Sequence, residues 1–437
     1  MLITTADRLE LMLDARAEAT RFRTENPPSA FHEHKLEKVW ERASTAPAYA
    51  PLPPFSMETF RDHPITRKED LKARPLDYCI VEPAEADKYY ETTGTTGRPT
   101  PTPRLAEDAI RNAVSVAEAW RPLLGERDRV LVLLPSDVVP VGDLVVHVCE
   151  YLGAVHTRAY PFATGICDWD RLTQIWETLR PTVLYVAPGV AQQLTRLLKR
   201  RDQLAAHRAS VEKIMLLGEV NTAPFRARLG AWWQAEVYDA SYGSTETGTL
   251  ATSCHAGRQH LLLAANHFEL ATADGVWPLR AGERGRLVVT PLNLHARPLL
   301  RLDTGDEVTL ADDCRCGTAA PSVTVHGRSS DALVLAGAKV TVREVEEIVY
   351  GETAATGYLM EVDPEGRPLR LLLERDSDWD RGAEGELADA VQAASRSSLR
   401  VTWGDVRFVN ALPVNTKSGA SQKSWKRTNL RVVEAGS

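Results

Sequence analysis

A loop crowded with threonine and glycine is the first segment of the chain that could do chemistry. It reads Tyr-Glu-Thr-Thr-Gly-Thr-Thr-Gly-Arg-Pro-Thr over residues 90–100. Glycine lets the backbone approach an anion with its N–H groups turned inward, and threonine hydroxyls can rotate to donate hydrogen bonds to phosphate oxygens. The loop is neither a GxxxxGK[ST] phosphate loop nor a GxGxxG dinucleotide fingerprint. It predicts a phosphate-binding loop of another kind, with an ordinary polar turn as the alternative.

Four further unusual segments follow this loop along the chain. Residues 241–248 read Ser-Tyr-Gly-Ser-Thr-Glu-Thr-Gly, 301–306 read Arg-Leu-Asp-Thr-Gly-Asp, and 326–331 read His-Gly-Arg-Ser-Ser-Asp. A tail between residues 415 and 427 is rich in lysine. Their presence in this order favours the phosphate-binding interpretation of the first loop over the polar turn.

A second group of residues could hold a metal ion. It consists of Cys254, with His255 and His260 after it, and of Cys314 and Cys316 further on. In a reducing compartment, clustered cysteine and histidine bind metal more often than they form disulfides. Three thiolates and one imidazole suit tetrahedral Zn²⁺ in a closed, structural site, with no open position for catalysis. We favour His260 over His255 as the fourth ligand, and free thiols in a loop are the alternative.

Alternating strands and helices must position these residues. Short apolar runs at 130–134, 182–186 and 213–217 predict buried strands. Strands that alternate with helices form a largely parallel sheet covered on both faces, so the fold class expected is α/β. The helices expected between and around these strands span 106–124, 141–153, 168–178, 188–202 and 223–234.

The ends of the chain have different patterns. Residues 5–46 have a helical rhythm, and the proline-rich stretch 46–54 predicts an extended linker. Short β runs follow between 258 and 310. From about 332 a small α+β unit is expected, with strands at 355–363 and 368–374 and a helix at 378–398.

Bulk composition limits the classes of function. The chain has 437 residues, which predicts two or more domains, and a formal net charge of −7. This mildly acidic balance argues against general affinity for nucleic acid or for an anionic membrane. No run approaches the roughly 20 apolar residues of a spanning helix, and the N-terminus becomes charged too early for a secretory signal. We expect a cytoplasmic location and reduced cysteines; Cys79, Cys149 and Cys167 are interpreted as buried small apolar residues.

The five segments together resemble the adenylate-forming superfamily of acyl-CoA synthetases, firefly luciferase and nonribosomal adenylation domains. Within it, the chain is most similar to the short phenylacetate–CoA ligase branch, from about residue 30 to about residue 427. The resemblance implies a large N-terminal domain of mixed parallel sheets layered with helices over 1–330. It also implies a small, mobile α+β domain over 331–437, with a hinge at Asp331.

The resemblance assigns the first loop to the β- and γ-phosphates of ATP. Arg98 stands where the family usually has lysine, which keeps the cation but replaces a point charge by a planar fork. The residues of this prediction are Thr92, Thr93, Gly94, Thr95, Thr96, Gly97 and Arg98.

Further nucleotide contacts are implied by the motif Tyr242-Gly243-Ser244-Thr245-Glu246. In the family, tyrosine stacks on adenine, threonine contacts the α-phosphate and glutamate binds Mg²⁺. A carboxylate-held Mg²⁺ with hydroxyl and cationic donors stabilises the charge that develops on the phosphates. Asp306 resembles the ribose-binding aspartate, and Arg328 resembles a second ribose and phosphate contact. Arg301 and Asp303 are interpreted as structural.

The segment Gly218-Glu219-Val220 resembles the strand end that packs on adenine. The proline and aromatic residue that usually follow are absent, so a simple strand-to-turn exit is the alternative. The pocket for the acid is expected near 140–150, 187–192 and 218–222. Its candidate residues are His147, Ala187, Pro188, Gly189, Val220 and Asn221.

The tail should supply the lysine that contacts the carboxylate and the α-phosphate. The usual pattern is Gly-Lys-x-x-Arg, and we assign Lys423, although Gln422 replaces the glycine. Lys417 and Lys426 remain candidates because the preceding stretch looks inserted. Many members of the branch also carry a Cys…His…Cys-x-Cys set similar to the metal cluster.

The activity that these likenesses imply is that of an acid–CoA ligase. ATP and Mg²⁺ would activate a small, aromatic acid as acyl-AMP with release of pyrophosphate, and CoA would displace AMP. The alternatives keep the first step but change the acceptor or the acid: amide formation, carrier-protein loading, or a nitrite-activating, diazo-forming enzyme that acts on an aryl amine. A non-catalytic nucleotide-binding protein is disfavoured because Glu246, Asp306, Arg328 and a tail lysine are present. A homodimer is expected only by likeness to the family.

Overall fold

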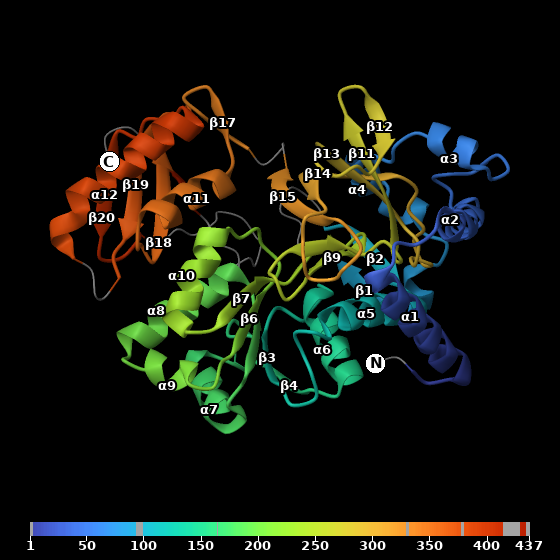
Figure 1. Cartoon of the computed structure of the whole chain (residues 1–437), viewed down its shortest axis with the longest axis horizontal. Helices are drawn as coiled ribbons and strands as arrows, with labels where there is room; N and C mark the ends of the chain where they lie inside the picture. Colours follow the sequence, from blue (N-terminus) through green and yellow to red (C-terminus); the bar gives the residue numbers. More distant parts are fainter. Residues whose placement is uncertain are drawn as a thin grey trace. The chain divides into compact units, whose positions relative to one another are not determined.

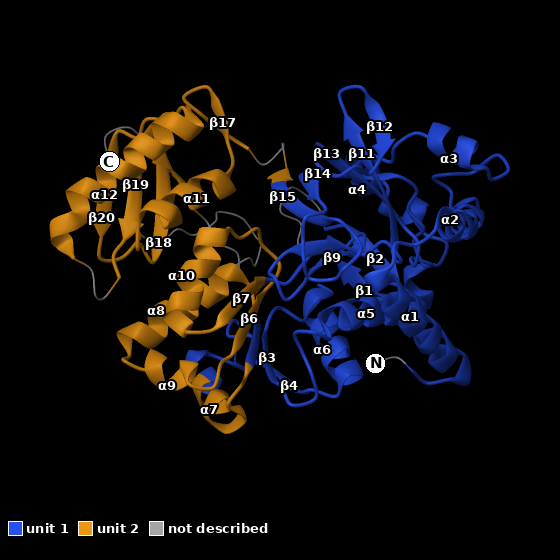
Figure 2. Ribbon diagram, in the orientation of Figure 1, with its two compact units in different colours: residues 1–172, 183–185, 239–326 blue, residues 173–182, 186–238, 327–437 orange. Residues whose placement is uncertain are grey.

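The computed structural model of the chain describes residues 3–92, 99–163, 165–328, 332–376, 380–413 and 429–433 (Figure 1). The chain divides into two compact units, unit 1 with residues 1–172, 183–185 and 239–326, and unit 2 with residues 173–182, 186–238 and 327–437 (Figure 2). The predicted hinge, Asp331, lies outside the described residues.

Unit 1 begins with helices whose apolar residues recur at helical spacing. Helix α5 buries Ala106, Ile110 and Val114 against Ala15 of α1, so α1 and α5 share a small apolar core. The helical rhythm predicted for residues 5–46 is confirmed by α1 and α2. The helices of this unit are α1 (Ala6–Thr24), α2 (Ser29–Ala43), α3 (Met57–Asp62), α4 (Lys68–Ala73), α5 (Ala106–Trp120) and α6 (Val141–Leu152), with 3₁₀ turns at Pro75–Tyr78 and Pro83–Glu85.

The expected extended linker at 46–54 is wrong at its start. Residues 46–49 form a bend and turns, in which the Tyr49 N–H donates to the Ala46 carbonyl. The Tyr49 ring is buried, and its hydroxyl lies 3.0 Å from the Thr66 hydroxyl. The apolar core therefore holds part of a segment whose proline content predicted an extended linker.

Parallel strands in unit 1 carry the buried apolar runs. Strands β3 (Arg129–Leu133) and β4 (Val155–Arg158) pair in parallel, and α6 packs against both. Val130, Leu131, Val132 and Leu133 are all fully buried, which is expected of a strand covered on both faces. Together with β5 (Val183–Val186) and the helices around them, these strands confirm the predicted α/β class with parallel pairing.

A large antiparallel sheet forms the rest of unit 1. Its strand order is β12-β11-β13-β14-β15-β10-β9-β8. Side chains of α2, among them Leu36, Val39 and Trp40, pack against it in one apolar core that also holds Leu250 and Phe268. The strands are β8 (Ser241–Ser244), β9 (Gly248–Ser253), β10 (Gln259–Leu261), β11 (Asn266–Thr272), β12 (Gly275–Pro278), β13 (Arg284–Pro291), β14 (Leu302–Ala311) and β15 (Ser322–Arg328), and a separate pair is β1 (Lys88–Glu91) with β2 (Pro101–Arg104).

Unit 2 contains a small α+β part, as predicted from residue 332 onward. A hairpin of β16 (Leu333–Leu335) and β17 (Ala338–Val340) leads into α11 (Val342–Glu352), which Thr341 and Glu344 begin with a reciprocal capping box. A four-stranded sheet follows in the order β20-β19-β18-β21. Its strands are β18 (Gly357–Val362), β19 (Pro368–Glu374), β20 (Asp405–Val409) and β21 (Leu430–Val432), accompanied by α12 (Glu384–Ala394), a 3₁₀ turn at Arg381–Ala383 and a π-helical turn at Ser395–Leu399.

The remaining elements of unit 2 come from the middle of the chain. They are most of α7 (Trp169–Leu179), then α8 (Pro188–Arg200), α9 (Leu204–Arg208), β6 (Lys213–Leu216), α10 (Ala223–Trp233) and β7 (Glu236–Asp239). Among the described residues of the whole chain, no helix combines the length and apolar character needed to cross a bilayer.

Candidate active site

The predicted phosphate loop lies between β1 and β2, and its base is fixed. The Thr100 N–H donates to the Thr92 hydroxyl at 2.9 Å, and the Thr92 N–H donates to the Thr100 carbonyl at 3.2 Å. These two hydrogen bonds hold the two ends of the loop together where it joins β1 and β2. Six residues of the prediction, Thr93, Gly94, Thr95, Thr96, Gly97 and Arg98, lie outside the described residues.

Glu246 lies in the tight connection between β8 and β9. The Thr247 N–H donates to the Ser244 hydroxyl at 3.2 Å, which closes the turn. Gly243 is required here, because a Cβ atom at this position would lie 2.2 Å from the Gly248 carbonyl oxygen. The turn leaves Thr245 half-buried and Glu246 only 4% exposed.

The surroundings of Glu246 are cationic. The Lys68 ammonium lies 4.0 Å from a Glu246 carboxylate oxygen. Burial alone would raise the pKa of Glu246, but Lys68, backbone hydrogen bonding and Arg297 outweigh it, so the pKa lies below its ordinary value. The carboxylate is ionised at neutral pH, in the state that a hard cation such as Mg²⁺ prefers as a ligand.

Two buried arginines beside Glu246 were missed in the sequence. Arg104 donates from Nη2 to the carbonyls of Thr245 and Glu246, at 2.7 and 2.9 Å. Arg297 belongs to the same cluster of charged side chains, because electrostatic interactions with Arg104 and Glu246 both affect its pKa. The sequence signal that could have revealed them was one arginine in each of two otherwise uncharged stretches. Arg104 lies in Pro-Thr-Pro-Arg, and Arg297 lies in Ala-Arg-Pro-Leu-Leu. Lys68, in a charged surface pattern, gave no signal.

Tyr242 and Asp306, predicted to contact adenine and ribose, lie together in unit 1. The Tyr242 hydroxyl donates to a carboxylate oxygen of Asp306 at 2.8 Å. Asp306 lies on β14, where its N–H donates to the Thr304 hydroxyl at 3.2 Å. Arg301, interpreted as structural, pairs with Glu269 at 2.9 Å, and Asp303 pairs with Arg286 at 3.1 Å.

His147 lies on α6 in a buried position of unit 1. Burial, with a smaller effect of Lys88, lowers the pKa of His147 to about 4, so the ring is neutral at pH 7. One turn earlier, the Asp143 carboxylate accepts from Lys88 at 2.6 Å and from the Tyr90 hydroxyl at 2.8 Å. These bonds attach α6 to the strand that leads into the phosphate loop.

Several predicted pocket and adenine residues lie together in unit 2. The Glu219 carboxylate accepts from the Gly189 N–H at 3.0 Å, at the first turn of α8. It therefore caps this helix, whose first turn follows Ala187 and starts at Pro188. Asn221 is fully buried, and its side-chain oxygen accepts from Arg226 at 2.8 Å. Val220 is exposed, and Gly218 has a φ of 87°, in the left-handed region.

The remaining predictions lie at or beyond the edge of the described residues. Arg328 is the last residue of β15 and is half-buried. The three tail lysines, Lys417, Lys423 and Lys426, lie outside the described residues, as does the hinge Asp331.

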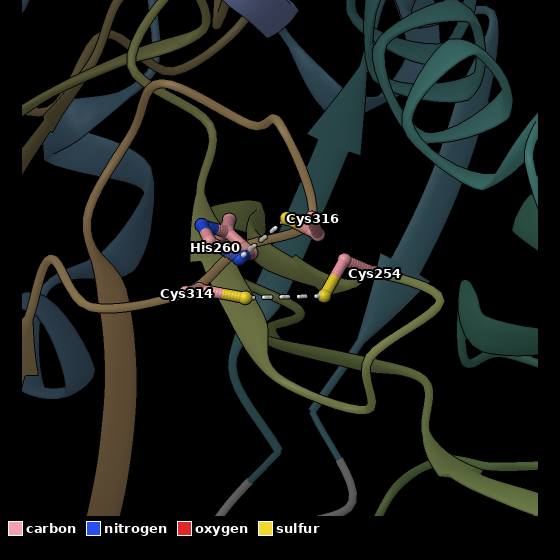
Figure 3. Close-up of side chains that lie close together, drawn as sticks. All are labelled: Cys254, His260, Cys314 and Cys316. Atoms are coloured by element: carbon pink, nitrogen blue, oxygen red, sulfur yellow. Dashed lines mark hydrogen bonds between the residues drawn. The ribbon is translucent and has the colours of Figure 1, made fainter.

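The four predicted zinc ligands converge at the β9–β10 connection (Figure 3). One potential ligand atom from each of Cys254, His260, Cys314 and Cys316 lies within 4.8 Å of all the others. The Cys254 and Cys314 sulfur atoms are 3.8 Å apart, and the Cys316 sulfur atom is 3.3 Å from Nε2 of His260. His255 is exposed and does not belong to this cluster.

The geometry of the cluster suits Zn²⁺. Four ligands at about 2.3 Å in a tetrahedron have sulfur atoms about 3.8 Å apart, which is the separation of Cys254 and Cys314. Nδ1 of His260 lies 2.7 Å from the Ala320 carbonyl oxygen. A hydrogen bond there fixes the tautomer and leaves Nε2 as the ligand atom.

Comparisons with known proteins bear on this arrangement. The sequence profile of the family described as "AMP-binding enzyme" matches residues 72–290, half of the chain. A phenylacetate–coenzyme A ligase of Thermus thermophilus is 28% identical over 294 residues, 65% of this chain and 64% of that protein, so this alignment spans less than two thirds of the relative. A phenylacetate–coenzyme A ligase of Aromatoleum evansii is 25% identical over 382 residues, 85% of either chain.

The fold is similar to that of a solved structure. A 2-hydroxyisobutyryl-CoA ligase in the postadenylation state, in complex with 2-HIB-AMP, superposes with a TM-score of 0.72 and 21% identity, over 99% of this chain and 90% of that one. The motifs around Glu246 and the phosphate loop lie within the matched family region. The chain therefore belongs to the AMP-binding enzyme family and is similar to phenylacetate–coenzyme A ligases.

Proposed function

We propose that the chain is an acid–CoA ligase for a small aromatic acid. A carboxylate oxygen of the acid attacks the α-phosphorus of ATP, and pyrophosphate leaves with the electron pair of the broken P–O bond. The CoA thiol, having lost its proton, then attacks the carbonyl carbon of the acyl-AMP, and AMP leaves. The observation that supports this proposal best is Glu246, an ionised carboxylate buried among cations within the family's matched region.

In this proposal the residues of unit 1 hold and orient the nucleotide. Thr92 and the loop after it donate to the phosphates, Thr245 donates to the α-phosphate, and Asp306 accepts from the ribose. Glu246 would hold Mg²⁺, which when bound neutralises the charge that develops on the phosphates. Tyr242 stacks on adenine while its hydroxyl remains bonded to Asp306.

Neutral His147 fits a pocket for an uncharged ring, because an imidazole with a pKa of about 4 brings no charge at neutral pH. In unit 2, the exposed Val220 and the first turn of α8 after Ala187 remain proposed pocket residues. Such a pocket selects by a few apolar contacts.

The test is release of AMP and pyrophosphate across a panel of small acids, with and without CoA, and with nitrite plus aryl amines as a separate arm. Turnover of one aromatic acid that requires CoA supports the ligase. Turnover of that acid with an amine or with the free thiol of a carrier protein, but not with CoA, assigns a different acceptor. AMP formation with nitrite alone identifies a diazo-forming enzyme and rules out the proposal.

We propose that residues 331–437 act as a mobile domain and that its tail supplies Lys423 as the catalytic lysine. Lys423→Ala should abolish formation of acyl-AMP but spare thioester formation from supplied acyl-AMP, because the lysine serves only the first step. Lys417→Ala and Lys426→Ala are the matched controls. Retained adenylation in Lys423→Ala, with loss in either control, would reassign the lysine.

We propose a structural zinc at Cys254, His260, Cys314 and Cys316. Three thiolates and one imidazole close a tetrahedral site, so the ion would join the β9–β10 hairpin to the loop after β14 without a position for substrate. Homodimerisation, a feature carried over from the family, is tested by light scattering of the purified chain.

A further inference from the structure

The strand after the phosphate loop, β2, is held by a buried arginine. Arg297 is fully buried and donates from Nη1 to the Pro101 carbonyl at 2.7 Å. Its Nη2 donates to the Thr102 hydroxyl at 3.1 Å, and that hydroxyl donates to the Thr100 carbonyl at 3.2 Å. Thr100 is the residue that closes the base of the loop with Thr92. The guanidinium of Arg297 therefore fixes the point where the chain returns from the loop.

The last residue of the same strand reaches the turn that carries Glu246. Arg104 is 6% exposed and donates from one nitrogen, Nη2, to the carbonyls of both Thr245 and Glu246. Burial lowers the pKa of Arg104, and Asp108, whose buried carboxyl group accepts from the N–H groups of Leu105 and His295, opposes this effect. Arg104 thus fixes the main chain of Glu246, and with it the position of the Glu246 carboxylate.

Stability of the fold does not by itself explain this pair of buried arginines. Arg104 and Arg297 are buried like charges, and burial, with Arg104 adding to it, lowers the pKa of Arg297 to about 10. Arg104 Nη1 and Arg297 Nε have no hydrogen-bond partner among the described residues. Apolar residues of similar volume often stabilise a fold as well as a buried ionic group does. The hydrogen bonds that the two guanidinium groups make with described residues all lead to the loop base or to the Glu246 turn.

We propose that Arg104 and Arg297 are positioning residues that join the base of the phosphate loop and the Glu246 turn into one rigid support. The base of the loop that would bind the phosphates and the carboxylate that would hold Mg²⁺ are then set at a fixed separation before ATP arrives. The inference rests on the proposed function, because it gives these residues a role only if the chain binds ATP with a divalent cation.

The experiment measures binding of Mn²⁺, as a probe for Mg²⁺, to the chain saturated with ATP, by electron paramagnetic resonance. In Arg104→Gln and Arg297→Gln the affinity for Mn²⁺ should fall about 10- to 100-fold, as when other supports of metal ligands are removed. Arg104→Lys should recover part of the loss, because an ammonium can still donate to a carbonyl. The KM for ATP should rise together with the Mg²⁺ requirement, in reactions with an accepted acid.

Arg301→Gln is the matched control. Arg301 is also a buried arginine, 5% exposed, but it pairs with Glu269 and donates to the carbonyls of Arg61 and His63. Its loss should lower the melting temperature without changing the affinity for Mn²⁺. If Arg104→Gln does not fold, Arg104→Lys and Arg297→Gln decide the question by the same measurement.

The outcomes separate the inference from the proposed function. Wild-type affinity for Mn²⁺ in folded Arg104 and Arg297 variants overturns the positioning role while ATP binding stands. Equal loss in Arg301→Gln also overturns it, because the effect would then be one of general stability. Failure of the wild-type chain to bind Mn²⁺ with ATP overturns the proposed function itself.

Discussion

The two ends of strand β9 carry two different kinds of candidate metal site. The connection before β9 holds Glu246, a single carboxylate with the Lys68 ammonium 4.0 Å away. The connection after β9 starts at Cys254 and leads to His260, which cluster with two more thiols within 4.8 Å. One protein ligand leaves most of a cation's coordination shell to substrate and water, whereas four fill the shell of Zn²⁺. One strand thus connects a site suited to chemistry with a site suited to holding loops together.

Among the variants that test this comparison, Glu246→Gln should have the largest effect. The amide keeps the shape of the side chain but removes the charge that would hold Mg²⁺, so acyl-AMP formation should fall by at least about 100-fold. Pyrophosphate release in a stopped assay measures this. Glu269→Gln is the control, since Glu269 is an equally buried carboxylate paired with Arg301. Comparable activity of Glu246→Gln and wild type would mean that Glu246 holds no cation in the reaction.

The second largest effect is expected at the end of β9 that leads to the cysteine and histidine cluster, and it concerns the stability of the chain. Cys316→Ser should release close to one zinc per chain and lower the free energy of unfolding by at least about 3 kcal/mol, because a lost metal is among the most destabilising changes. Elemental analysis and urea unfolding measure the two quantities. Cys79→Ser and Cys149→Ser alter buried thiols outside the cluster and should leave the zinc content unchanged. Well under one zinc per chain in the wild type would remove the zinc site.

A smaller change is expected from Tyr242→Phe. It removes the 2.8 Å hydrogen bond to Asp306 and keeps the ring that would stack on adenine. One such bond contributes about 1 kcal/mol, so the KM for ATP should rise about five-fold with kcat nearly unchanged. Steady-state kinetics with varied ATP test this, with Tyr238→Phe, whose hydroxyl bonds to Glu236, as the control. A change in kcat alone would assign the hydroxyl to the reacting groups.

The smallest expected effect is the dependence of stability on pH. Because the pKa of Glu246 is lowered in the folded state, its ionised form stabilises the fold above its unfolded pKa of about 4.3. This contribution is lost as the pH falls through the folded pKa. The free energy of unfolding of wild type relative to Glu246→Gln should therefore decrease between pH 7 and pH 3.5. A constant difference across that range would show that Glu246 is not stabilised as a carboxylate.

The parts of the fold that the sequence predicted are those governed by local patterns. The apolar run at β3 and the helical spacing of α1, α5 and α6 depend on residues a few positions apart, so periodicity reveals them. The start of the stretch 46–54 was mispredicted as an extended linker, because proline indicates only where a regular helix cannot form. The burial of Tyr49 depends on contacts with Thr66 and with the Leu300 N–H, which have no local signature.

The sequence by itself determined the family, the type of chemistry and the candidate residues, because each motif is a short run whose side-chain types suit phosphate, ribose or metal. Only the tertiary structure decided that His260 and not His255 joins the three cysteines, and that the Tyr242 hydroxyl bonds to Asp306. It alone also brought Arg297 against strand β2, and Arg104, the last residue of that strand, against the Glu246 turn, although these partners lie far apart along the chain. Such contacts depend on which strands of a sheet become neighbours, and no spacing within one segment encodes that.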